Sequence, residues 1–143
     1  MDEATLIERL LKIEALFAGA TTGGERAAAA EARARILERL AVLAEEEAPV
    51  EFKFTMPDEW SRRVFLALLR RYGLKPYRRY RQRYTTVMVR VPRRFVDETL
   101  WPEFERIESE LRRYLGEVTD RIVASVLEAD SSDAPVMEQR LLP

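Results

Sequence analysis

Residues 84–91 read Tyr-Thr-Thr-Val-Met-Val-Arg-Val, and this stretch decides the fold class. β-Branched residues are dense in it, and they favour extended backbone because their side chains pack well on a pleated surface. Positions 85, 87, 89 and 91 share one face of an extended chain. Pro92 follows and ends the stretch. We therefore predict a β-strand here, in a chain whose longer segments are helical.

Two further segments are expected to join this strand in a small sheet of about three strands. Residues 51–55, Glu-Phe-Lys-Phe-Thr, alternate between polar and apolar side chains with the period of two that strands require. Residues 75–80 also read as extended, so residues 81–83 must turn the chain, although they contain no preferred turn residue. If the two strands of the β-α-β unit are parallel, their connection should cross over in the right-handed sense.

Apolar residues that recur at helical spacing predict four helices, over residues 4–17, 25–46, 57–72 and about 99–129. A Thr/Gly-rich segment, residues 19–24, separates the first two, so we expect them to form an antiparallel helical hairpin. Thr22 and Glu25 have the spacing of a capping box at the start of the second helix.

The third and fourth helices carry their own start and stop signals. Thr55-Met56-Pro57-Asp58 matches a second capping box, with proline in the first turn. Gly73 stands where a left-handed residue would end the third helix. The fourth helix is expected to begin near Thr99, with Pro102 in its first turn.

The predicted order is α-α-β-α-β-β-α, an α+β fold in which a small sheet packs on helices. We expect one domain over residues 1–129, made of the hairpin (1–47) and a β-α-β-β-α part (50–129). Residues 130–143 are small, polar and interrupted by proline, so they are expected to form a flexible tail.

The 143-residue chain contains neither Cys nor His. This composition excludes disulfides, zinc fingers, cysteine nucleophiles and Ser-His-Asp triads. We therefore expect no enzyme activity, no cofactor and no metal site. No apolar stretch approaches the roughly 20 residues that cross a bilayer, so no membrane partner is expected. The acidic start, Met1-Asp2-Glu3, does not resemble a secretion signal, and we expect a cytoplasmic protein.

The net charge of −1 hides a strong segregation of charge along the chain. Residues 60–94, called the basic block below, contain twelve Lys and Arg residues and no Asp or Glu. The residues before it carry a net charge of −6 and those after it −7. Such a block meets either an anionic partner or the acidic parts of its own chain.

Arginine and tyrosine residues are interspersed in this block. The two types suit nucleic acid because guanidinium groups contact phosphates while aromatic rings stack on bases. The candidate contact residues are Arg62, Arg63, Arg70, Arg71, Lys75, Arg78, Arg79, Tyr80, Arg81, Arg83 and Tyr84. We predict a non-catalytic module that binds nucleic acid or another polyanion. Two alternatives remain open: the arginines pair with acids of the chain, or they form a protein interface, including one between copies of this chain.

Three other patterns have plainer explanations. Glu51-x-Lys53 beside Pro57-Asp58 contains the residue types of some metal-dependent nucleases, but in reversed order, and Asp58 is better explained as part of a helix start. The acids at 45–47 lie at a helix C-terminus, where a basic partner is expected to compensate for them. Trp60 and Trp101 are expected to anchor helices in the core.

Residues 1–45 resemble the N-terminal helical hairpin of an uncharacterised family of bacterial and phage-associated domains. The features that carry the resemblance are Leu10-Leu11-Lys12-Ile13, Leu16, the turn at Thr21–Gly24, Glu25 and an alanine-rich helix that reaches Ile36 and Leu37. It implies a bacterial or phage origin and supplies no mechanism. Some relatives of that family carry a metallopeptidase-like segment with histidine, and this chain has no histidine to support such an activity.

Overall fold

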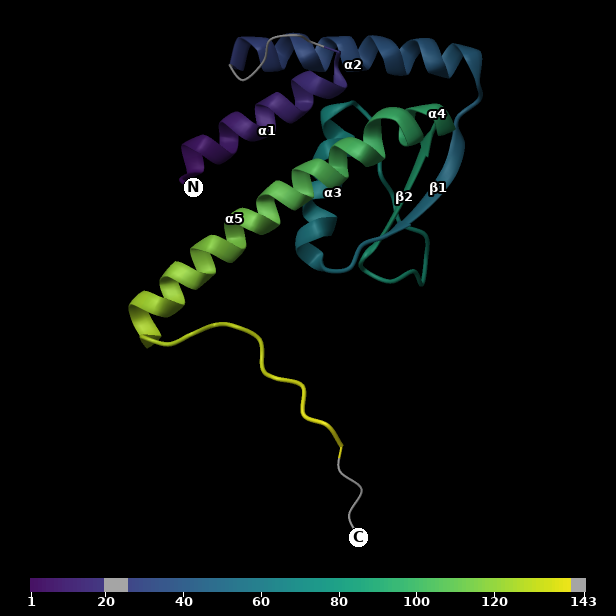
Figure 1. Ribbon diagram of the computed structural model, residues 1–143. Coiled ribbons are helices and arrows are strands. Elements are labelled where there is room, and N and C mark those ends of the chain that lie inside the picture. Colours follow the sequence, from purple (N-terminus) through teal and green to yellow (C-terminus); the bar gives the residue numbers. More distant parts are fainter. Residues whose placement is uncertain (20–25, 140–143) are drawn as a thin grey trace.

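The computed structural model describes residues 1–19 and 26–139 (Figure 1). The elements are α1 (Glu3–Phe17), α2 (Arg26–Glu46), β1 (Val50–Thr55), α3 (Glu59–Arg71), β2 (Thr86–Val91), α4 (Arg93–Phe95), the π-helical turn η1 (Val96–Leu100) and α5 (Trp101–Leu127). The α+β class is confirmed. The predicted capping box of Thr22 and Glu25 lies outside the described residues.

The sheet has two strands in the part of the chain that the structure describes, and the prediction of three is wrong. β1 and β2 are antiparallel, with Val50 opposite Val91 and Thr55 opposite Thr86, so the connection between these two strands is not a parallel crossover. The third segment contributes only a single bridge, in which Tyr77 and Met88 exchange two backbone hydrogen bonds of 2.8 Å.

The third strand stops after one bridge because the next backbone groups are used in a turn. The N–H of Arg79 donates to the side-chain oxygen of Gln82 at 2.8 Å, and the carbonyl of Arg79 accepts from the N–H of Gln82 at 3.2 Å. Arg81 completes this turn with a φ of 67°. The predicted turn at residues 81–83 therefore starts earlier, and β2 begins only at Thr86.

One face of the sheet packs into the core. The register places Phe52 opposite Val89 and Phe54 opposite Val87, and these side chains meet the apolar faces of α3 and α5. The ring of Phe54 stacks on Trp101 with centroids 5.6 Å apart. The period of two in β1 and the anchoring role of Trp101 are thus confirmed.

Helix α3 has a defined cap at each end. The carboxylate of Asp58 accepts a 2.7 Å hydrogen bond from the N–H of Ser61, so Asp58 caps the helix and not Thr55, as the predicted capping box required. At the other end Gly73 has a φ of 72°, and the N–H of Leu74 donates to the carbonyl of Leu69 at 3.0 Å. The predicted glycine stop is confirmed.

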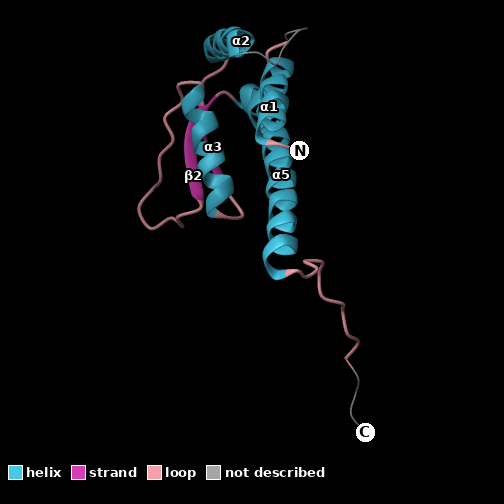
Figure 2. Cartoon of the chain, turned by 90° about the vertical axis from the view of Figure 1, so that its left-hand side faces the viewer, coloured by secondary structure: helices cyan, strands magenta, loops and turns pink. Residues whose placement is uncertain are grey.

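The two N-terminal helices pack on each other, but they cross instead of lying side by side along their lengths. Arg39, beyond the middle of α2, donates a 2.6 Å hydrogen bond to the carbonyl of Phe17 at the end of α1. α1 itself lies along α5 in the opposite direction: the amino group of Met1 is 3.4 Å from Glu117, and Arg9 is 3.5 Å from Glu110 (Figure 2).

The last helix begins earlier than predicted. α4, η1 and α5 follow one another without a break from Arg93, so Pro102 lies inside a continuous helix. A proline ring clashes with the carbonyl four residues before it, and here that residue, Glu98, lies in the wide π turn. The C-terminal half of α5 projects beyond the other elements, and residues 128–139 leave it without regular secondary structure (Figure 1).

No helix in the described ranges combines the length and the apolar character needed to cross a lipid bilayer.

Candidate nucleic-acid interface

The basic block is only partly neutralised by the rest of the chain. Among the described residues, four of its twelve basic side chains form ion pairs: Arg62, Arg71, Arg79 and Arg94. The other eight have no acidic partner within 4 Å there, namely Arg63, Arg70, Lys75, Arg78, Arg81, Arg83, Arg90 and Arg93. Internal pairing therefore explains a minority of the block.

Several of these side chains meet at one hollow, which we call the arginine hollow. It has a volume of about 220 Å³, and it is lined by Arg62, Leu66, Arg70, Pro76, Tyr77, Arg78, Tyr84, Thr86 and Val87. The spacing of four along α3 places positions 62, 66 and 70 on one helix face. That face forms one wall, and the loop between α3 and β2 forms the opposite wall.

An arginine and a tyrosine are stacked at the edge of the hollow. The guanidinium carbon of Arg62 lies 3.9 Å from the ring centroid of Tyr84, and its Nη2 donates a 2.5 Å hydrogen bond to the tyrosine hydroxyl. Arg78 lies 5.3 Å from the same centroid. The contact between Arg62 and Glu59 is long, at 3.8 Å, and the buried Nε of Arg62 has no hydrogen-bond partner among the described residues.

The loop beyond the hollow presents further candidate residues to solvent. Tyr80 lies in the turn formed by residues 79–82, and it is 89% exposed. Arg81 and Arg83 are also exposed. An exposed aromatic ring beside unpaired guanidinium groups is the arrangement that single-stranded nucleic-acid sites use, with bases on the ring and phosphates on the cations.

The structure removes Arg71 from the predicted interface. Its guanidinium donates two hydrogen bonds to Glu14 of α1, which is 7% exposed, and a third, of 3.3 Å, to the carbonyl of Ala29. The hydrogen bonds that it donates to this carboxylate raise the pKa of Arg71. Arg71 thus ties α3 to α1 and faces away from the hollow.

Arg79 is also occupied, on the outer face of the sheet. It donates to Glu51 of β1, and the Tyr77 hydroxyl donates to the same carboxylate oxygen. The hydrogen bond from Tyr77, and then that from Arg79, lower the pKa of Glu51. Arg63 and Lys75 are exposed, but neither lines the arginine hollow.

The two acidic residues of the nuclease-like pattern, Glu51 and Asp58, have separate partners. Glu51 is held by Tyr77 and Arg79, whereas Asp58 caps α3 and lies 2.7 Å from Arg112. Nowhere in residues 1–19 and 26–139 do three acidic side chains gather closely enough to hold a metal ion. The acids at the end of α2 have the basic partner that the sequence predicted, because Glu46 is 3.2 Å from Arg94 and Glu47 accepts the N–H of Arg94 at 2.9 Å.

The sequence did not reveal two polar networks. Glu103 is fully buried and has both carboxylate oxygens within 2.8 Å of the Tyr72 hydroxyl. Arg112 joins Asp58, Ser61 and Glu108 through hydrogen bonds of 2.7–2.9 Å. No periodic pattern marks Glu103, because a glutamate early in a helix normally indicates a favourable exposed position beside the helix N-terminus.

Comparison with known protein-family models, curated proteins and solved structures finds no match to this chain.

Proposed function

We propose that the protein is a non-catalytic module that binds nucleic acid through the basic block, with the arginine hollow at the centre of the contact surface. One observation carries this proposal: eight basic side chains of the block have no acidic partner in the described chain, and two of them, Arg70 and Arg78, converge with Arg62 on one hollow. Unpaired guanidinium groups at such a concave surface supply the phosphate contacts that dominate nucleic-acid affinity.

The aromatic residues of the block favour single strands over duplexes. The ring of Tyr80 is exposed, with the guanidinium carbon of Arg81 5.5 Å from its centroid, and Tyr84 is held against two guanidinium groups at the edge of the hollow. Bases of a single strand are unstacked and reach such rings, whereas duplex bases are not available for stacking. A cytoplasmic location and a bacterial or phage origin remain predictions that accompany this proposal.

Fluorescence anisotropy with mixed-sequence single- and double-stranded oligonucleotides, at several salt concentrations, tests the proposal. The double variant Arg70→Gln/Arg78→Gln should bind single strands more weakly, and the slope of log K against log salt should shrink by about 0.7 per lost phosphate contact. The control variant Arg35→Gln/Arg121→Gln removes the same charge outside the basic block and should bind like the wild type.

Three results would contradict the assignment of a nucleic-acid site. Equal loss of affinity in the test and control variants would mean that only net charge matters, and equal affinity for an acidic polysaccharide such as heparin would indicate a general polyanion site. Absence of binding at low salt would remove the proposal altogether.

A second candidate function, self-association, is favoured by a different observation. Apolar side chains in the projecting half of α5 are 42–71% exposed, namely Leu115, Ile122, Val126 and Leu127. Monomeric proteins rarely leave such a continuous stripe uncovered. If two copies associate there, sedimentation at rising concentration should show a dimer for the wild type and a monomer for Ile122→Glu, and high salt should not weaken the dimer.

A further inference from the structure

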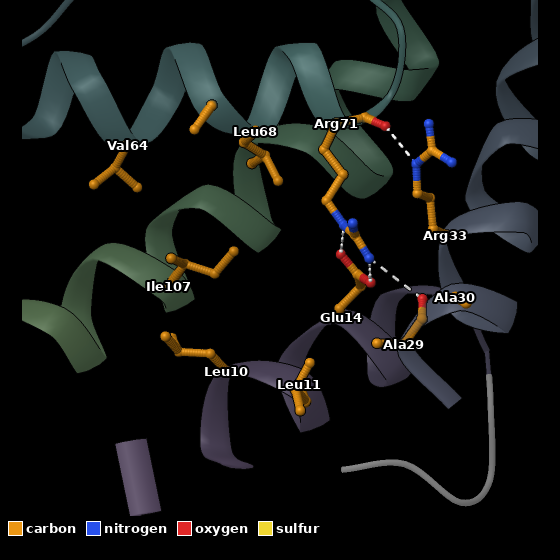
Figure 3. A pocket seen from close by; sticks show the side chains of 11 residues that line it. Leu10, Leu11, Glu14, Ala29, Ala30, Arg33, Val64, Leu68, Arg71 and Ile107 are labelled. Carbon is orange, nitrogen blue, oxygen red and sulfur yellow. Dashed lines mark hydrogen bonds and ion pairs between the residues drawn. The ribbon is translucent and has the colours of Figure 1, made fainter. Parts of the chain in front are cut away.

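A groove opens on the side of the molecule that carries the first helices. It has a volume of about 710 Å³, and it lies between α1 and α2 on one side and α3 on the other, with α5 at its base (Figure 3). Volumes of this order are typical of small-molecule sites. Arg71, which does not line the arginine hollow, lines this groove, and the two sites have no lining residue in common.

The groove has an apolar part and a charged end. Leucine, valine and isoleucine side chains gather in its apolar part, as Figure 3 shows: Leu10, Leu11, Val64, Leu68 and Ile107. The charged end holds Glu14, Arg71 and Arg33. A ligand that matches this division has a flexible apolar body and one polar group.

Counted over the described residues, the charged end carries one positive charge in excess. Both oxygens of Glu14 are taken by Arg71, and the Nε of Arg33 donates to the carbonyl of Arg71 at 2.9 Å. The terminal nitrogens of Arg33, and the Nη1 of Arg71, have no hydrogen-bond partner in the described part of the chain. Among the described residues, the charged end thus holds two guanidinium groups, of which only Arg71 is paired with the Glu14 carboxylate, and the open donors fit one more anionic group.

The neighbouring acid does not cancel this charge. Glu103 lies behind the pair, with its carboxyl group against the Tyr72 hydroxyl. Burial raises the pKa of Glu103 to about 8, so this group is neutral at pH 7. The excess positive charge at Arg33 and Arg71 is left for a ligand.

We propose that this groove binds an aliphatic monocarboxylate, with the alkyl chain along the leucine-lined part and the carboxylate on Arg33 and Arg71. A carboxylate matches the planar, two-pronged donor geometry of guanidinium groups. No aromatic side chain lines the groove among the described residues, so a nucleobase has no ring on which to stack. A single negative charge matches the excess positive charge of the site.

Calorimetric titration with decanoate, below the concentration at which it forms micelles, tests this assignment. Saturable binding of one decanoate per chain is expected. Octanoate, which has two methylenes fewer, should bind about fifteenfold more weakly, because each buried methylene contributes close to a factor of four. Decanol lacks the charge and acetate lacks the chain, so both should bind at least tenfold more weakly than decanoate.

Two variants locate the ligand. Arg33→Gln removes the unpaired cation, and Ala67→Phe fills the groove from an exposed position on α3. Each should weaken decanoate binding at least tenfold. The matched controls Arg35→Gln and Ala34→Phe alter exposed positions of α2 that do not line this groove, and they should bind like the wild type.

Absence of saturable decanoate binding would overturn the proposal, as would decanol binding as tightly as decanoate. Unchanged affinity in both Arg33→Gln and Ala67→Phe would also overturn it, because the ligand would then lie elsewhere. Circular dichroism of each variant serves as the control that the variant is folded. These results do not depend on whether the basic block binds nucleic acid.

Discussion

A carboxyl group with no solvent exposure lies between α3 and α5, where Glu103 meets the Tyr72 hydroxyl. Burial raises its pKa from 4.5 to about 8, and the charge of Glu14 acts in the same direction. The Tyr72 hydrogen bond and the charge of Arg71 lower it, but they do not outweigh burial. The native protein therefore holds this carboxyl group protonated at neutral pH.

This protonation makes the stability of the protein depend on pH. Between pH 4.5 and about 8 the native state binds a proton that the unfolded state has lost, so the free energy of unfolding falls as the pH rises through this window. Arg71 and Tyr72 do not titrate there, because the pKa values of both are raised. Urea unfolding at pH 5, 7 and 9 should show a decreasing midpoint.

The variant Glu103→Gln separates this effect from other titrations. Glutamine keeps the shape and stays neutral, so the part of the decrease that comes from position 103 should disappear. Glu105→Gln, at an exposed position of the same helix, should keep the wild-type profile. Parallel profiles for the wild type and Glu103→Gln would show that this carboxyl group is ionised in the native state.

The pair of Glu14 and Arg71 is the main polar link between α1 and α3. Glu14→Gln replaces one acceptor oxygen by an amide that faces the guanidinium donors, and should lower the free energy of unfolding by about 1–3 kcal/mol. Glu8→Gln, which removes an exposed carboxylate 3.7 Å from Lys12, should change it by less than about 1 kcal/mol. Thermal melts of the two variants that coincide would contradict a structural role for the pair.

Among the secondary-structure elements, those with strong local signals were predictable from the sequence. The alternation in β1 and the β-branched run of β2 indicated strands, and Gly73 marked the end of α3. The loss of the expected third strand was not predictable, because a hydrogen bond from the backbone of Arg79 to the side chain of Gln82 replaces the sheet ladder. The π turn was hidden for a similar reason, since nothing in Val96–Leu100 breaks the helical pattern.

The loop between α3 and β2 should contribute little to folding. Arg78, Arg79, Arg81 and Arg83 are all exposed, and the one ion pair among them, with Glu51, lies on the surface. Changing the four together to glutamine should alter the free energy of unfolding by about 1 kcal/mol or less, because exposed pairs contribute so little. Urea denaturation measures this, and a loss several times larger would mean that the loop holds the sheet together.

In the whole molecule, α5 is followed by a segment whose described residues, up to position 139, are exposed. Val136 and Met137 are 96% and 82% exposed, and residues 130–139 have no regular secondary structure. Truncation after Ala129 should therefore leave the melting temperature unchanged within about 2 °C. A larger decrease in calorimetry would show that the apolar residues of the tail dock on the body.

The location of the candidate interface was predictable from charge segregation, but its composition was not. The sequence pointed to eleven residues, and four of them, Arg62, Arg70, Arg78 and Tyr84, line the arginine hollow. The sequence alone places Arg71 among the contact residues, because its partner Glu14 is fifty-seven positions away. Long-range pairs of this kind leave no periodic pattern, and the monocarboxylate groove, built from four helices, leaves none either.

The wide turn of η1 changes the directions in which the side chains of α5 point around the helix axis. A π turn holds one more residue than an α turn, so every side chain of α5 is rotated by about 100° from where an uninterrupted helix would place it. The inward direction of Glu103 and Phe104 depends on that extra residue. Deleting exposed Asp97 would restore the ordinary period, and it would turn the charged face of α5 inward while leaving the amino-acid composition almost unchanged. A single-residue deletion in this turn would therefore change which side chains of α5 face the core. The same deletion in the projecting end of α5 would only shorten the helix.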